Sequence, residues 1–161
     1  MLNPAIDTAT NPPLDDRVAS ATQNDPDKND PSYALALAAV EAADDRKAGN
    51  ITWLNVAGVS ILSDYFIIAT GYSTTQVRAI ATEIEDRIEA QFQRLPRHVE
   101  GRQAGTWILM DYEDAIVHVM LESEREFYNL EAFWGHAPRV QYSPQSASTQ
   151  PHSNPTGIDN H

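Results

Sequence analysis

The stretch SDYFIIATGYSTTQVRAIATEIEDRIEAQF, residues 63–92, carries the strongest structural pattern in this 161-residue chain. Its first part, residues 63–70, is a nearly continuous apolar run that ends at Gly71, which predicts a buried central strand. Its second part, residues 73–92, repeats apolar side chains every three or four positions, which predicts an amphipathic helix capped by Ser73 or Thr74. A buried strand followed by such a helix favours a sheet with helices packed on it.

Elements upstream and downstream complete this interpretation. A helix over residues 33–48 is predicted, with Ser32 as its N-cap and Gly49 just beyond its end. A last helix over residues 123–134 begins with a capping box of Ser123 and Glu126. Further strands are predicted over residues 51–56, 97–101, 106–112 and 115–121. The order α-β-β-α-β-β-β-α predicts an α/β fold with a mixed β-sheet and packed helices.

The distribution of proline divides the chain into a domain and two tails. Nine of the ten prolines lie at or before Pro31 or at or after Pro138, among many Ser, Asn, Asp and Thr residues. Such segments bury too little apolar surface to offset the entropy of ordering. We therefore predict disordered tails over residues 1–31 and 141–161, and a folded domain over residues 32–140.

The chain is strongly acidic, with a net charge of −12. The predicted domain alone has 9 basic and 16 acidic residues, a net charge of −7. Proteins that grip phosphates usually have a basic surface, so little direct contact with nucleic acid is expected and a basic protein partner fits better. The chain has no cysteine, no apolar run long enough to span a membrane and no secretory signal pattern, so we expect a cytoplasmic protein.

The segment WILMDYEDAIVHVM, residues 107–120, holds Asp111, Glu113, Asp114 and His118. If the strand continued through Asp111 and Glu113, both carboxylates would lie on one face and could hold Mg²⁺, provided that a phosphate cradle lay nearby. Carboxylates are also common where two strands reverse direction, because they accept hydrogen bonds from backbone amides. The favoured interpretation is that these carboxylates stabilise a turn by accepting hydrogen bonds, and no metal or cofactor is predicted.

His118 shares a strand face with apolar side chains, and no other histidine stands at metal-ligand spacing from it. A lone histidine in that setting is more often packed and hydrogen-bonded than metal-bound. The turn TGYSTTQ, residues 70–76, could present amides to an anion, but with a single glycine and no Gly-Lys pair it is not a phosphate-binding loop. The aromatic segment FYNLEAFW, residues 127–134, is either packed on the sheet or part of a partner surface.

Taken together, the motifs DYFIIATGYSTTQVRAIA, VEG, WILMD, DAIVHVM and EREFYNLEAFW resemble the ribosomal silencing factor family, also called Iojap-like. The resemblance runs from about Tyr33 to Trp134. It implies a domain with nucleotidyltransferase-like topology that is not an enzyme. It also implies binding to a basic protein of the large ribosomal subunit, the universal protein numbered fourteen, which sterically blocks subunit joining and represses translation when nutrients are limited. Family members often form homodimers.

Carried over by position, the resemblance places partner-binding residues on the predicted hairpin and on the Glu-Gly pair before it. These residues are Glu100, Gly101, Trp107, Leu109, Asp111, His118 and Met120. Arg102 and Gln103 follow the Glu-Gly pair where family members often have an acidic or small residue. Two alternatives to silencing stay open: a role in large-subunit assembly, and a divergent Mg²⁺-dependent nucleotidyltransferase.

Overall fold

The computed structural model describes residues 28–143, so most of both predicted tails, residues 1–27 and 144–161, lies outside the described residues. Five strands form one sheet in the order β1-β2-β5-β4-β3. β2 runs parallel to β5 and the other neighbours are antiparallel, which confirms the predicted mixed sheet. The strands are β1 (Gly49–Asn55), β2 (Tyr65–Gly71), β3 (His98–Glu100), β4 (Trp107–Asp111) and β5 (Ala115–Leu121).

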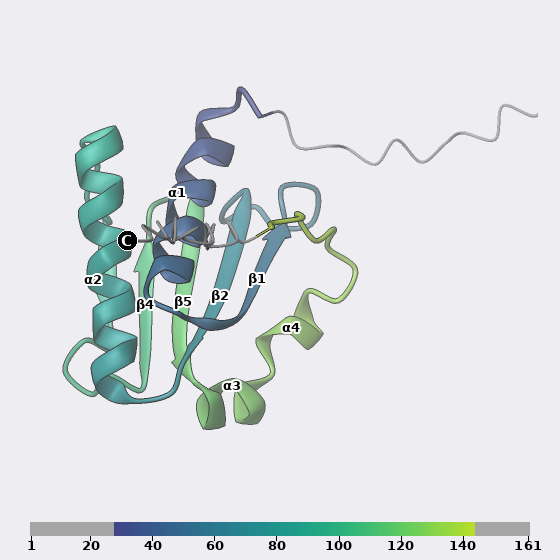
Figure 1. The fold of residues 1–161 in the computed structure, drawn as a ribbon. Helices are drawn as coiled ribbons and strands as arrows, with labels where there is room; N and C mark the ends of the chain where they lie inside the picture. The colour runs from purple at the N-terminus through teal and green to yellow at the C-terminus, as the bar shows by residue number, and fades with distance from the viewer. Residues whose placement is uncertain (1–27, 144–161) are drawn as a thin grey trace, which may run out of the picture.

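Two long helices, α1 (Pro31–Asp45) and α2 (Thr74–Phe92), cover one face of this sheet (Figure 1). The apolar stripe of α2 is buried from Val77 to Ile88, as its spacing predicts, and Phe92 at its end is partly buried. The buried face of α1 is rich in alanine, whose small side chains let α1 pack closely beside α2. The main hydrophobic core lies between these helices and the sheet. None of the helices within residues 28–143 is long and apolar enough to cross a membrane.

The ends of α1 differ from the prediction. Asp30, not Ser32, is the N-cap: its carboxylate accepts a hydrogen bond from the Ser32 amide at 3.0 Å, and Pro31 occupies the first helical position. The Ser32 hydroxyl instead donates to Asp64 at 3.1 Å. Gly49 does not end the helix but begins β1, because the left-handed turn after α1 is made by Lys47, with φ at 58°.

The predicted last helix is broken in two. α3 (Glu122–Tyr128) and α4 (Leu130–Phe133) are separated by Asn129, whose φ of 42° is left-handed. The predicted capping box is wrong, because α3 already begins at Glu122 and no side chain caps it. Beyond α4 the chain runs along the free edge of β1, where Val140 donates to the Trp53 carbonyl at 2.8 Å. This segment covers the edge strand β1 and so hinders the pairing of another strand with it.

Candidate binding face

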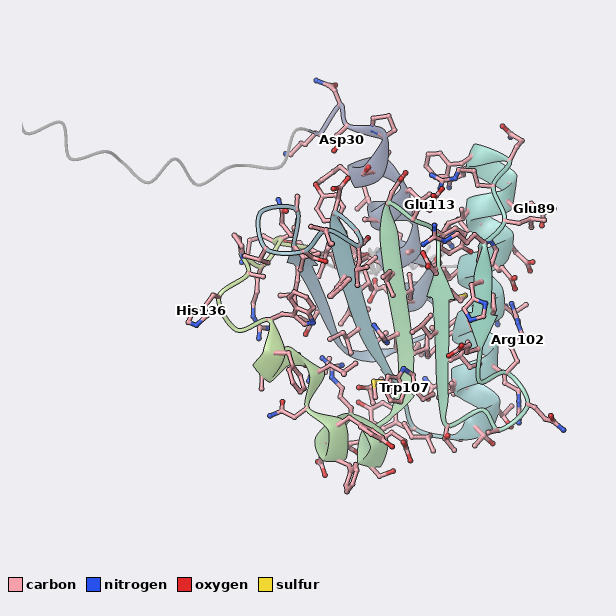
Figure 2. All side chains as sticks on the ribbon, turned by 180° about the vertical axis from the view of Figure 1, so that it is seen from behind. Asp30, Glu89, Arg102, Trp107, Glu113 and His136 are labelled. Carbon is pink, nitrogen blue, oxygen red and sulfur yellow. The ribbon has the colours of Figure 1, made fainter. Side chains whose placement is uncertain are left out.

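The sheet face opposite α1 and α2 brings most of the sequence-predicted site residues together. The β3–β4 and β4–β5 registers align Glu100 with Leu109 and Leu109 with His118 in one row. The same registers pair Trp107 with Met120 and Asp111 with Ile116. Side chains two apart on a strand share a face, so these residues lie on one side of the sheet. We call the partly exposed part of it, over β3, β4 and β5, the open face; Figure 2 views the sheet from this side.

Trp107 lies at the edge of the open face next to α3 (Figure 2). Its indole Nε1–H donates a hydrogen bond to Nδ1 of His118 at 3.1 Å. Its ring also lies 4.9 Å from the ring of Tyr128, centroid to centroid. The side chain is partly exposed, so part of a large aromatic residue that these contacts orient remains accessible to a partner.

His118 is packed within the sheet, between the rings of Phe66 and Trp107. Burial lowers the pKa of His118 to about 4, because the charged imidazolium is disfavoured away from water. The ring is therefore neutral near pH 7, which its role as acceptor from Trp107 also requires. His118 orients Trp107 and carries no charge to a partner.

Met120 lies on the same side of the sheet but has no exposed surface, so it is not accessible to a partner in this conformation. Its burial coincides with the packing of α3 against β5 and β2. The sequence could not show this, because a strand pattern gives the face of a residue but not what covers it.

Asp111 ends β4 and organises the turn that follows. One of its carboxylate oxygens accepts from the Glu113 amide at 2.8 Å, and the other pairs with Arg97 at 3.0 Å. Glu113 has a left-handed φ of 67° and also pairs with Arg97, at 3.1 Å. The two carboxylates therefore do not share a strand face, and the turn interpretation is confirmed. Within residues 28–143, no group of three His, Asp or Glu side chains is arranged to hold a metal.

Gly101 directly follows β3 and has a φ of 88°, a conformation that side-chain-bearing residues rarely adopt. A Cβ placed on it would lie 1.8 Å from the carbonyl oxygen of Trp107. The following loop is fastened to α2 by Arg78, which donates to the carbonyls of Arg102 at 3.0 Å and Gln103 at 2.7 Å. Gly101 thus allows a close backbone approach beside Trp107.

In the turn before α2, side chains of the turn and of the helix form hydrogen bonds with nearby backbone groups. Ser73 caps the helix by accepting from the Gln76 amide at 3.1 Å, which confirms it as the cap. The Gln76 side chain accepts from the Tyr72 amide at 2.8 Å and donates to the carbonyl of Lys47 at 3.1 Å. These contacts tie α2 to the end of α1.

Arg125 is the residue beside this face that the sequence did not single out. It is 8% exposed and uses all five of its N–H donors inside the protein. The acceptors are Asn50 on β1, the hydroxyls of Thr52 and Thr70, and Glu131 on α4. Burial alone would raise the pKa of Glu131, but the hydrogen bonds and charges of Arg125 and Arg139 together outweigh it and lower that pKa. The cavity of about 230 Å³ beside Arg125 thus offers no free guanidinium donor to a ligand.

Comparisons with known proteins agree over this domain. A family described as "Ribosomal silencing factor during starvation" matches residues 29–160. The chain is 43% identical to the ribosomal silencing factor RsfS of Halalkalibacterium halodurans over 107 residues, 66% of this chain and 91% of that protein. It is 42% identical to RsfS of Bacillus subtilis over 100 residues, 62% of this chain and 84% of that one. A crystal structure of a Chromobacterium violaceum protein superimposes with a TM-score of 0.61 at 31% identity, covering 73% of this chain and 95% of that chain.

Proposed function

The chain belongs to the ribosomal silencing factor family, and from this premise we propose that it binds the large ribosomal subunit and sterically blocks joining of the small subunit. The proposed partner is the universal large-subunit protein numbered fourteen, and the proposed result is repression of translation during nutrient limitation. Such a factor acts in the cytoplasm, where subunits meet. Blocking needs only occupied volume at the subunit interface, so no catalytic group is required.

The open face supports this proposal. It presents a fixed aromatic residue, Trp107, beside the aliphatic side chain of Leu109, and Glu100 and Asp111 lie at its margin. An aromatic and aliphatic centre with a polar rim is the usual composition of a protein-binding site. The net charge of −12 attracts a basic ribosomal protein and opposes close contact with ribosomal RNA. The proposed contacts are Trp107 and Leu109, with the acids facing Lys or Arg of the partner.

A sucrose-gradient assay with purified subunits tests the proposal. Small and large subunits are combined at a Mg²⁺ concentration that joins them, with and without the protein. We expect the joined-ribosome peak to decrease and the protein to sediment with the large subunit. A joined-ribosome peak that is unchanged at saturating protein would contradict the blocking role.

A thermal-unfolding assay tests the non-enzymatic part of the proposal. A nucleotidyltransferase would bind nucleoside triphosphate with Mg²⁺, and a ligand that binds the native state raises the melting temperature. We expect no rise with each of the four nucleoside triphosphates at millimolar concentration. A clear rise that disappears in Asp111→Asn would favour the enzyme instead.

A further inference from the structure

A row of aromatic rings continues from the open face onto α3. His118 lies 5.8 Å from Trp107, Trp107 lies 4.9 Å from Tyr128, and Tyr128 lies 4.9 Å from Phe127, measured between ring centroids. Exposure increases along this row: Trp107 is partly exposed, Tyr128 is 45% exposed and Phe127 is 81% exposed. The apolar surface of the open face therefore does not stop at the sheet but extends onto the helix.

The charge on α3 is suited to a cationic partner. Glu122 and Glu126 are exposed on this helix, whereas its single basic residue, Arg125, is buried and fully paired. A ring face attracts Lys and Arg, and nearby carboxylates strengthen the attraction. Exposed aromatic residues on a helix that also exposes carboxylates thus favour a basic protein surface over an apolar one.

The position of α3 is fixed by hydrogen bonds from its buried Arg125. Arg125 joins it to β1 through Thr52, to β2 through Thr70 and to α4 through Glu131, with donor–acceptor distances of 2.9 Å, 2.9 Å and 3.0 Å. Breaking such a buried network is costly, so a single position of the helix is strongly favoured. The exposed rings are therefore held in place before any partner arrives, which reduces the entropy lost on binding.

We propose that Phe127 and Tyr128 on α3 form a second contact for the basic partner, continuous with Trp107, in which their rings receive Lys or Arg side chains. The inference rests on the proposed function and extends it from the sheet to the helix. It identifies α3 as a binding element in addition to its role in covering the end of the sheet.

Phe127→Ala tests the inference, because its side chain is too exposed for its loss to disturb the core. Phe133→Ala on α4 is the matched control: Phe133 is 78% exposed, and no aromatic contact joins it to Trp107 in the described part of the chain. We expect Phe127→Ala to bind purified large subunits roughly fivefold more weakly than the unaltered chain and Phe133→Ala to bind normally. Phe127→Leu, which keeps apolar bulk without the ring, should not restore binding.

The outcomes separate this inference from the proposed function. If Trp107→Ala weakens binding but Phe127→Ala does not, the open face is the binding site and the extension onto α3 is wrong. Equal losses in Phe127→Ala and Phe133→Ala would also overturn it, as would full rescue by Phe127→Leu. Binding of the protein to naked ribosomal RNA with the same dependence on Phe127 would replace the protein partner with a nucleic acid. A chain that does not bind large subunits at all would overturn both proposals.

Discussion

The two faces of the β-sheet differ in burial and in role. On the face under α1 and α2, Ile67, Ile108 and Val117 are fully buried and belong to the main hydrophobic core. On the open face, the neighbouring residues Trp107 and His118 are partly exposed and joined by a hydrogen bond. The alternation of side chains along β4 and β5 therefore separates residues that stabilise the fold from residues available to a partner.

The largest predicted effect lies on the helix-covered face. Ile67→Ala should lower the free energy of unfolding by about 3 kcal/mol, because it removes buried methyl groups and leaves a cavity. Urea denaturation measures the loss. The folded fraction should bind large subunits with unchanged affinity. Leu109→Ala on the open face is the comparison. It should lower the free energy of unfolding by only about 1 kcal/mol but weaken binding to large subunits. If both variants lost similar stability and bound large subunits with similar affinity, the proposed division into a stabilising face and a binding face would be wrong.

His118 should make stability depend on pH. Its pKa is lowered to about 4 in the folded state from an ordinary value of 6.5, so between these values the unfolded state binds more protons. Stability should therefore be fully present above pH 6.5 and decrease as the pH falls toward 4, by no more than about 3 kcal/mol. Urea denaturation across this range measures it. His118→Gln should flatten the profile; an equally steep profile in that variant would assign the effect to other groups.

A substitution of Gly101 tests whether the backbone geometry beside Trp107 contributes to stability. Gly101→Ala should cost about 2 kcal/mol, since it forces a side chain into a left-handed conformation and against the Trp107 carbonyl. Gly58→Ala is the matched control, because a Cβ there meets nothing within 4 Å, and it should be nearly neutral. Thermal unfolding compares the two. Equal melting temperatures would show that the β3–β4 loop adapts without cost.

The smallest predicted effect is at the acidic turn. Glu113→Gln should change stability by less than about 0.5 kcal/mol, since Glu113 is exposed and its pair with Arg97 lies in water. Addition of Mg²⁺ should shift the melting temperature of the original chain and of the variant equally. A Mg²⁺ stabilisation that is lost in Glu113→Gln would revive the metal-site hypothesis.

Local patterns predicted the parts of the fold that depend on periodicity. The apolar spacing of α2 and the run of β2 give their positions within two residues, and β5 was predicted with the observed bounds. Each of these elements buries a regular face, so its sequence contains the information. The alternation in β5 likewise predicted that His118 shares a strand face with Ile116 and Met120, whereas Trp107, Leu109 and Asp111 were grouped with it only through the family resemblance.

The errors occur at the ends of helices, where single side-chain or backbone contacts decide the outcome. Ser123 and Glu126 match a capping box, yet α3 begins earlier and ends at a left-handed Asn129. This break lets Glu131 reach Arg125, and no periodicity encodes such a pair. The burial of Met120 also depends on where α3 packs. The partner-binding role of the open-face residues stays a prediction.

Large-subunit binding by Trp107→Ala tests the central claim most directly. The variant protein is first shown to be folded by its cooperative urea transition, and its cosedimentation with purified large subunits is then titrated. We expect binding to weaken by at least about 2 kcal/mol, roughly thirtyfold in Kd, because Trp107 is the aromatic centre of the proposed surface. Unchanged cosedimentation of the folded variant would contradict the assignment of the open face as the ribosome-binding site.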